Sequence, residues 1–330
     1  MSTLYLIEQG TRLEKESKRL IITKENKILL EVPEFKIERI FIFGNVQITT
    51  QAIKFLLENN IETSFFNIYG KLVGRLLPAQ SKNVILRIAQ FKKAEDLGFK
   101  LSFAKRIVEG KINNAKVFLQ KYARNHPEVD FTSSIEEMNF CLEELKRKTQ
   151  VTSVLGLEGR CSAIYFQTLS KMFRKELKFE ARIRRPPPDP INSLLSLGYS
   201  LITNEMFSVL VSVGFDPYVG FLHGIEYGRP SLALDLIEEF RHAIIDRLTV
   251  ELINKEIFTK DDFEEQEGTY LLKRDSLKKY FQHYERRMLS SFEEPKERTE
   301  VNYRKMFLLQ ALQLSKSLQT DCLYTPFSIR

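Results

Sequence analysis

Hydrophobic and polar residues follow two different spacings along the chain, and the change comes near residue 80. Before it, short runs rich in leucine, isoleucine and valine alternate with polar turns, as in LYLI, RLIIT, KILLEV and residues 39–43. Runs of this length and composition are typical of β-strands. A short helix is predicted at 50–57, with Thr49 or Thr50 as its N-cap, and a hairpin is predicted around Gly70. This part of the chain is expected to form a small, mostly antiparallel β-domain.

After Pro78 the hydrophobic residues recur at helical spacing to the end of the chain. The predicted helices span residues 84–109, 113–125, 135–148, 156–177, 190–213, 231–254, 271–290 and 301–318. We therefore expect a two-domain α+β fold. Residues 1–80 form the β-domain with its short helix, and residues 81–330 form an all-α helical domain.

The net charge and the hydrophobic content of the chain limit the kinds of function that it can have. The 330 residues include 50 lysines and arginines against 43 acids, a net charge of +7, which favours a polyanionic partner such as nucleic acid. A hydrophobic content of 43% and a charged content of 28% are typical of a soluble globular protein. No hydrophobic run is judged to approach the roughly 18 residues of a membrane span, and MSTLYLIEQG lacks the basic region of a secretory signal. A soluble, cytoplasmic protein with no membrane partner is expected.

Motif spacing excludes several kinds of site. The three cysteines lie far apart with no CxxC pair, so neither a zinc ribbon nor a disulfide framework is predicted. The sequence also lacks GxxxxGKS/T, GxGxxG, HExxH and GxSxG. These absences argue against a P-loop NTPase, a dinucleotide-binding fold, a zincin and an α/β-hydrolase.

The segment 220–241, GFLHGIEYGRPSLALDLIEEFR, holds the strongest candidate chemistry. His223 lies in a glycine-flanked turn, and Asp235 and Glu238 lie one turn apart on a predicted helix. An imidazole and carboxylates that converge are typical ligands of a divalent metal ion. A plainer interpretation stays open, because a lone histidine is commonly a core residue. Asp235, Glu238 and His242 also lie opposite the hydrophobic stripe of their helix, as solvated residues do.

Other candidate residues can also be interpreted in two ways, as functional groups or as purely structural ones. Glu158 lies between Gly156 and Gly159 at a predicted helix start, where it either binds a ligand or caps the helix. Tyr165 follows on the same helical face. A basic cluster either contacts DNA phosphates or forms a solvated face; its members are Lys171, Arg174, Lys175, Lys178, Arg182, Arg184 and Arg185. Two polar residues lie on one face of the next predicted helix, Asn192 and Tyr199.

Five segments, in this order, resemble the CRISPR-associated spacer-acquisition integrase family, the metal-dependent endonuclease of the CRISPR adaptation module. They are GNVQITTQAIKFL with FFNIYGKLVGRLLP, LGLEGRCSAIYF, RRPPPDPINSLLSLGYSLI, GFDPYVGFLHGIEYGRPSLALDLIEEFR and GTYLLKRDSLKKYFQHYERRM. The resemblance implies an N-terminal β-sandwich, a C-terminal helical catalytic domain and a homodimer formed largely through the β-domains. It also implies assembly with a small ferredoxin-like adaptation protein around double-stranded DNA.

The resemblance also implies roles for single residues. The catalytic metal ligands of the family fall on Glu158, His223 and Glu238, and a supporting aspartate falls on Asp235. Further positions near the family's site are matched by Tyr165, Asn192 and Tyr199. The implied cofactor is Mn²⁺ or Mg²⁺, and mixed nitrogen and oxygen ligands suit manganese somewhat better.

The reaction that the resemblance implies is attack of a DNA 3′-hydroxyl on a phosphodiester of the CRISPR repeat array, which inserts a new spacer. Water in place of the hydroxyl would give simple cleavage. Two alternatives stay open. One is a non-catalytic DNA-binding scaffold of the adaptation complex, and the other is a general metal phosphodiesterase that acts on branched DNA or RNA.

Overall fold

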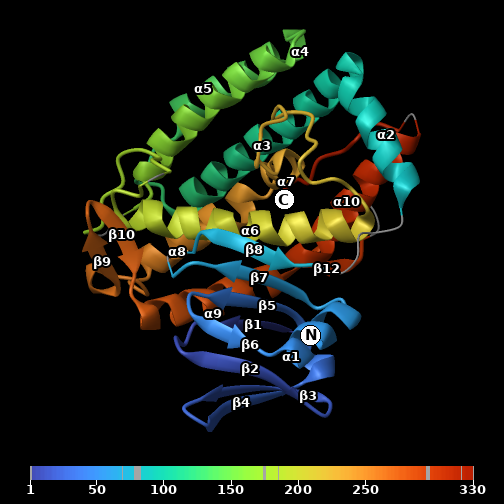
Figure 1. The fold of residues 1–330 in the computed structure, drawn as a ribbon. Helices are drawn as coiled ribbons and strands as arrows, with labels where there is room; N and C mark the ends of the chain where they lie inside the picture. The colour runs from blue at the N-terminus through green and yellow to red at the C-terminus, as the bar shows by residue number, and fades with distance from the viewer. Residues whose placement is uncertain are drawn as a thin grey trace. The chain divides into compact units, whose positions relative to one another are not determined.

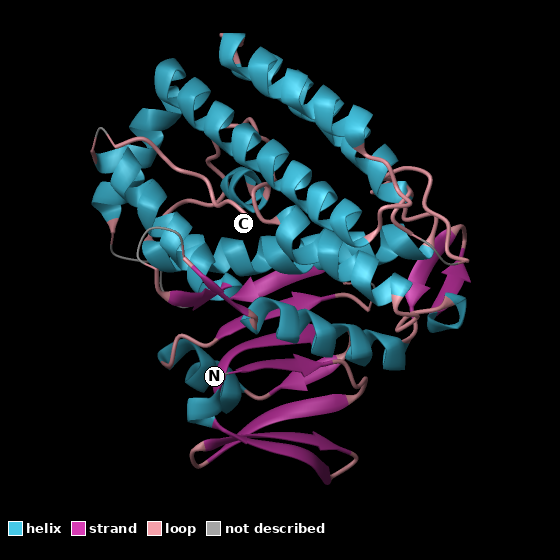
Figure 2. Ribbon diagram, turned by 180° about the vertical axis from the view of Figure 1, so that it is seen from behind, coloured by secondary structure: helices cyan, strands magenta, loops and turns pink. Residues whose placement is uncertain are grey.

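The computed structural model divides the chain into two compact units, which are drawn as ribbons in Figures 1 and 2. Unit 1 comprises Met1–Gln80 with Leu272–Glu285, and unit 2 comprises Ser81–Leu271 with Arg286–Arg330. The structure describes residues 2–68, 70–77, 83–173, 176–184, 186–294, 298–320 and 322–329.

Unit 1 contains two four-stranded sheets and the helix α1 (Thr50–Glu58). One sheet has the order β1-β5-β7-β8 and the other β4-β3-β2-β6. The strand bounds are β1 Ser2–Leu6, β2 Thr11–Glu16, β3 Arg19–Lys24, β4 Lys27–Pro33, β5 Ile37–Phe43, β6 Val46–Ile48, β7 Glu62–Phe66 and β8 Leu72–Leu76. The side chain of Thr49 accepts a hydrogen bond from the Ala52 amide and so caps α1, as predicted.

The strand directions in unit 1 differ from the mostly antiparallel expectation. β1 pairs in parallel with β5, β5 with β7, and β2 with β6. The antiparallel pairs, β2–β3, β3–β4 and β7–β8, join strands that follow each other along the chain. Glu25 and Asn26 both have positive φ in the β3–β4 turn, the geometry that favours a tight hairpin. The parallel pairs join distant strands, about which the local pattern carries no information.

Both sheets and α1 share one hydrophobic core. Its buried members are Leu6, Leu13, Leu20, Ile22, Ile37, Ile40, Ile42, Ala52, Phe55, Leu56 and Ile61. Because leucine and isoleucine side chains from each sheet meet in this core, the strands are held as two packed layers. The predicted division into a strand-rich part and a helical part is confirmed.

The helix α9 (Arg274–Leu289) departs from the expected domain division. Most of it groups with the strands of unit 1, although residues 81–330 were all assigned to the helical domain. The ring of Phe281 stacks on Tyr5 with 4.2 Å between ring centroids, and the Tyr5 hydroxyl donates to Glu285 at 2.6 Å. Aromatic contacts to the first strand therefore decide where this helix belongs.

Unit 2 is mainly helical, with two small hairpins. Its elements are α2 Val84–Glu95, α3 Leu97–Asn125, α4 Thr132–Arg147, α5 Val151–Ser170, α6 Pro190–Val213, α7 Ser231–Ile237, the π-helical turn η2 His242–Asp246, α8 Arg247–Asn254, η3 Lys260–Asp262, β9 Phe263–Gln266, β10 Thr269–Leu272, β11 Ser291–Glu293, β12 Glu300–Asn302 and α10 Tyr303–Gln319. In both ribbon views α3 runs beside α5, and α7 lies against α6.

Several helix boundaries differ from the predicted ones. Asp96 separates α2 from α3, because its carboxylate accepts the Phe99 amide and caps a new helix. The predicted break before residue 113 is absent from α3, which the structure describes along its whole length. The predicted helix 231–254 is interrupted after α7 and passes through η2 before α8 begins. A π-helical turn inside a helical segment is a frequent mark of a functional site.

Within the described part of the chain, one helix, α6, is long and hydrophobic enough to cross a membrane by length and composition alone. The hydrophobic pattern was expected to contain no run of this length, so α6 is an exception to that expectation. However, 61% of its hydrophobic window is buried inside the protein, and the core helix of a soluble protein passes the same test. In unit 2 it packs against α7 and α10.

The C-terminal segment is fastened to the buried carboxyl of Glu239. The hydroxyl of Tyr324 and the backbone amide of Phe327 both donate to it. Burial raises the pKa of Glu239 to about 8, against the opposing effect of these two donors. Asn114 on α3 adds to the attachment, since its amide group donates to the Phe327 carbonyl at 2.9 Å.

Replacing Tyr324 with phenylalanine is expected to lower the free energy of unfolding by about 1–3 kcal/mol, the usual range for a buried polar group that loses its partner. The loss should be larger at pH 9 than at pH 6. Above the pKa of about 8 the Glu239 carboxyl is ionised, and the ionised form depends more on the hydroxyl donor. Urea denaturation of the wild-type and variant proteins at the two pH values measures the loss in free energy of unfolding at each. An equal loss at both would show that Glu239 does not titrate in this range.

Candidate metal centre

The loop that carries His223 folds onto α7 through the fully buried carboxylate of Asp235. Oδ2 of Asp235 accepts hydrogen bonds from the backbone amides of Phe221 and Leu222, at 2.7 and 3.0 Å. Oδ1 accepts from the amide of His223 at 2.8 Å and from its Nδ1 at 2.7 Å. Because an ionised carboxylate only accepts, Nδ1 carries a proton, and in the neutral imidazole the lone pair then lies on Nε2, where a ligand can bind.

Gly220 permits this close approach of loop and helix. A Cβ atom at this position would lie 2.7 Å from Cβ of Ser231 and 2.9 Å from Oδ2 of Asp235. A larger residue would therefore push the loop away from the carboxylate that positions His223. The hydroxyl of Ser231 donates to the carbonyl oxygen of Gly224 at 2.8 Å, which fastens the other end of the loop.

Glu158 on α5 and Glu238 after α7 meet at one cation, the ammonium group of Lys111 on α3. This ammonium contacts Oε1 of Glu158 and lies 2.6 Å from Oε2 of Glu238. The side chains of Lys111 and Glu238 are buried, and that of Glu158 is 19% exposed. Two segments that are distant in sequence therefore direct their carboxylates at a single position, and a third segment, α3, supplies the cation there.

The plainer interpretations of these acids are wrong. Glu158 lies in the middle of α5, so it does not cap a helix start. Asp235, Glu238 and His242 are at most 2% exposed, so they do not form a solvated face. Ionisable side chains are buried at such a level only where partners compensate them.

Both carboxyl groups at the cation position have lowered pKa values. Burial, and then the charge of Glu238, raise the pKa of Glu158, but the charge of Lys111 and the hydrogen bonds from Lys111 and Ser162 together lower it. Burial acts in the same direction on Glu238, and there Arg241 and Lys111 together lower the pKa to about 2. His223 is near enough to lower the pKa of Glu238 further. Both carboxylates are therefore ionised at neutral pH, the form in which they bind metal.

The donor set fits a divalent metal ion, although Lys111 takes its position in this structure. Across the described residues, no three histidine, cysteine, aspartate or glutamate side chains come together as a metal-holding group. The ammonium between the two carboxylates stands in for the cation instead. With it elsewhere, Glu158, Glu238 and Nε2 of His223 would offer two carboxylates and one neutral imidazole, the donors of Mn²⁺ and related ions.

Lys111 and Arg241 are functional candidates that were not predicted from the sequence. Nη2 of Arg241 lies 2.9 Å from Oε1 of Glu238, and its guanidinium lies 4.7 Å from the ring centroid of Tyr199. No sequence signal singled out Lys111, because it lies in the predicted break between the helices 84–109 and 113–125, whereas α3 is continuous there.

Tyr165 and Tyr199, which were expected near the site, come together at Asp246. Asp246 is fully buried, and its carboxylate accepts from both tyrosine hydroxyls, at 2.8 Å from Tyr165. Nδ1 of His242 donates to the same carboxylate at 2.7 Å. Burial and the Asp246 charge raise the pKa of both tyrosines well above 10. Neither hydroxyl is directed at Glu158 or Glu238. No sequence signal singled out Asp246.

Asn192, which was expected near the family's site, fastens a neighbouring segment of chain to α6. Its side chain bonds the amide of Ile183, the carbonyl of Ala181 and the guanidinium of Arg182, and so fastens residues 181–183 to α6. Arg182 also donates to Ser196 at 3.1 Å, so it is already engaged within the protein.

The other described members of the predicted basic cluster are exposed: Lys171, Lys178 and Arg184. The remaining members lie outside the described residues: Arg174, Lys175 and Arg185.

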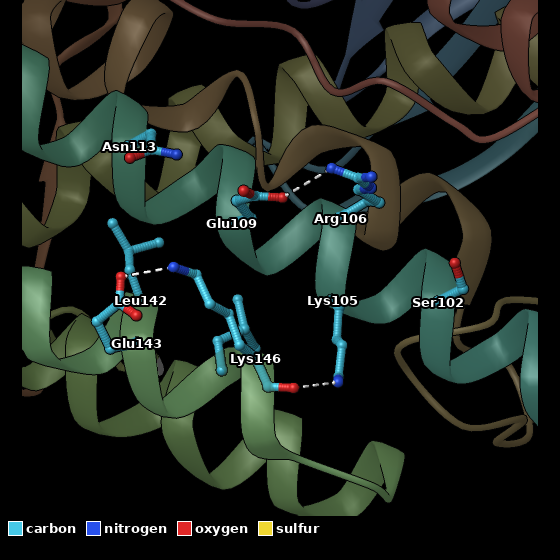
Figure 3. A pocket seen from close by; sticks show the side chains of 9 residues that line it. Ser102, Lys105, Arg106, Glu109, Asn113, Leu142, Glu143 and Lys146 are labelled. Atoms are coloured by element: carbon cyan, nitrogen blue, oxygen red, sulfur yellow. Dashed lines mark hydrogen bonds and ion pairs between the residues drawn. The ribbon is translucent and has the colours of Figure 1, made fainter.

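A pocket of about 530 Å³ lies between α3 and α4 (Figure 3). None of the predicted metal ligands lines it. Its charged groups are paired locally, since Arg106 lies 3.2 Å from Glu109 and Lys146 lies 2.6 Å from Glu143. The ammonium of Lys105 donates to the Lys146 carbonyl. The pocket therefore does not share the donor set of the candidate metal centre.

Comparison with known proteins places the chain in a family. A model of the family described as CRISPR associated protein Cas1 matches residues 4–286. The chain belongs to the Cas1 family. A relative from Thermus thermophilus, named a CRISPR-associated endonuclease Cas1, is 35% identical over all of this chain and 98% of its own length. A second endonuclease Cas1, from Chlorobaculum tepidum, is 31% identical over 99% of this chain and 98% of its own length.

Solved structures agree with this assignment. A casposase bound to an integration product has a TM-score of 0.88 and 27% identity, and the match covers 99% of this chain and 93% of that one. A Cas1 protein from Thermotoga maritima has the same fold, with a TM-score of 0.85 over 99% of this chain and all of the other. The family that the sequence resembled is confirmed, as are the two-domain α+β class and the nuclease class of enzyme.

Proposed function

We propose that this Cas1-family protein is a metal-dependent DNA endonuclease and integrase whose metal ligands are Glu158, His223 and Glu238. The observation that carries the assignment is the convergence of two ionised carboxylates at one cation position. His223 lies close enough to Glu238 to act on it electrostatically, and its Nδ1 is bound to Asp235, which leaves Nε2 as the ring nitrogen that could bind the ion. Such a centre needs no protein nucleophile, in agreement with a sequence that lacks nucleophile motifs.

The proposed reaction transfers a DNA strand. A 3′-hydroxyl of the incoming DNA forms a new P–O bond, while the bond to the 3′-oxygen of the repeat strand breaks. The attacking hydroxyl gives up a proton and the departing oxygen takes one. A bound divalent ion would lower the pKa of the attacking hydroxyl and offset charge on the phosphate oxygens. Water as the attacking group would yield cleavage instead.

The chain's own residues would prepare the centre for this chemistry. Asp235 holds His223 in the tautomer that leaves Nε2 available. Arg241 binds Oε1 of Glu238, which turns Oε2 toward the cation position. Members of this family generally depend on a divalent metal. Manganese is the proposed ion and magnesium the alternative, because one nitrogen donor among oxygens favours manganese.

Partners are proposed on the same basis. Double-stranded DNA is the proposed substrate, supported by the net charge of +7 and by a solved relative that is a casposase bound to an integration product. A homodimer through the β-domains is supported by exposed hydrophobic residues on and beside β4, namely Ile28, Leu29, Leu30 and Phe35. A small ferredoxin-like adaptation protein in a larger complex and a cytoplasmic location complete the proposal.

The test is integration of a short duplex with free 3′-hydroxyls into a supercoiled plasmid that carries a CRISPR repeat. We expect joined products with manganese and none after chelation. Tight, salt-dependent DNA binding with no strand transfer would support the scaffold alternative. Cleavage of branched DNA or RNA in place of integration would support the general phosphodiesterase.

A further inference from the structure

His242 presents a buried acceptor next to the candidate metal centre. Its Nδ1 is bound to Asp246, so in the neutral imidazole the lone pair lies on Nε2, and this atom has no hydrogen-bond partner among the described residues. The side chain is 3% exposed. A buried polar atom in this condition costs free energy unless some donor reaches it in another state.

A small cavity connects this acceptor with Lys111. The cavity has a volume of about 10 Å³ and is lined by Lys111, Glu158, Ser162, Tyr165 and His242, among others. A volume of this size accommodates about one water molecule, or an ammonium group of similar size. Among the charged groups that line it, only Lys111 carries a donor cation on a long, flexible side chain.

Lys111 is bound by the same two carboxylates that would hold a metal ion. One ammonium cannot share their oxygens with a divalent cation, because the two positive charges would repel each other at contact distance. Some other acceptor must therefore receive Lys111 when the ion is present.

We propose that Lys111 has two positions, one between Glu158 and Glu238 without the metal, and one at Nε2 of His242 when the metal is bound. In the first position the ammonium compensates two carboxylates that would otherwise repel each other. In the second, the lone pair of His242 accepts the displaced ammonium within the cavity. Lys111 and His242 are thus positioning residues that set the affinity of the centre for metal. This inference rests on the proposed metal site.

The measurement is manganese affinity of the full chain, by titration calorimetry at one fixed pH, together with thermal unfolding without metal. Lys111→Met removes the competing cation, so manganese should bind about tenfold tighter, because the ion-free site is no longer blocked in most molecules. The same substitution should lower the melting temperature of the metal-free protein. Lys111→Gln provides a second uncharged variant if the methionine variant does not fold.

His242→Asn tests the second position. The asparagine amide can still donate to Asp246 but offers no group at the place of Nε2. Manganese should bind about three- to tenfold more weakly, since the displaced ammonium has no acceptor. In the Lys111→Met background the asparagine substitution should have no effect on affinity. A merely structural role of His242 would give the same loss in both backgrounds.

The outcomes separate this inference from the proposed function. If the wild-type protein does not bind manganese, the metal site itself is wrong, and the inference fails with it. If wild-type protein binds manganese and both uncharged Lys111 variants bind it no tighter, the two-position inference is overturned while the metal site stands.

Discussion

Glutamine in place of Glu238 should reduce metal-dependent strand transfer by about 10³-fold or more, equivalent to roughly 4 kcal/mol of lost transition-state stabilisation. The substitution keeps the size of the side chain but removes the charge that Arg241 and Lys111 hold in the ionised state. A neutral amide is a poor ligand for a divalent ion beside a single remaining carboxylate. The rate of joining into the repeat plasmid measures the effect.

The matched control is Glu251→Gln. Glu251 lies on α8, its side chain is 43% exposed, and its ion-pair partner is Lys255, the residue that follows the end of this helix. This control should retain wild-type strand transfer. Circular dichroism must show that the Glu238 variant is folded, because a buried ion-pair partner has been removed. A folded Glu238→Gln protein with wild-type strand transfer would contradict the assignment of this residue as a ligand.

Asparagine in place of Asp235 should lower manganese affinity by about 10- to 100-fold, the usual effect of losing the residue that orients a metal-binding histidine. Asp235 accepts four hydrogen bonds, three from backbone amides and one from His223. The asparagine NH₂ group cannot accept, so at least one buried amide loses its acceptor. If that group faces Nδ1, the opposite tautomer of His223 is favoured, which places the proton on Nε2.

Titration calorimetry with manganese measures this loss, and Asp261→Asn on the exposed η3 provides the control. The free energy of unfolding should also fall by about 1–3 kcal/mol, the cost of a buried donor without an acceptor. Unchanged affinity in a destabilised variant would show that Asp235 only packs the loop and does not position the imidazole.

The sequence identified much of this centre but not the groups that hold it. His223, Asp235 and Glu238 lie in one segment, and the mixture of imidazole and carboxylates is visible there. Glu158 lies 62 residues before the start of that segment at position 220, and only the family resemblance joined it to the others. Its structural link to Glu238 is Lys111, which comes from a third helix.

The error about the helix at 231–254 has a physical cause. Polar residues opposite a hydrophobic stripe are solvated when that face meets water, and the sequence does not show what covers it. Here α3 supplies Lys111 for Glu238, α5 and α6 supply Tyr165 and Tyr199 for Asp246, and the loop 221–223 supplies the donors for Asp235. In unit 1 the strands could be predicted from local alternation, whereas the parallel pairing of β1 with β5 depends on contacts between distant segments.

The most direct test of the metal centre is the position of manganese in crystals of the wild-type protein soaked with the ion, located by anomalous scattering. We expect one strong peak bound by the carboxylates of Glu158 and Glu238 and by Nε2 of His223, with the Lys111 ammonium no longer between the carboxylates. A strong manganese peak elsewhere in unit 2, with Lys111 still bound to both glutamates, would contradict it.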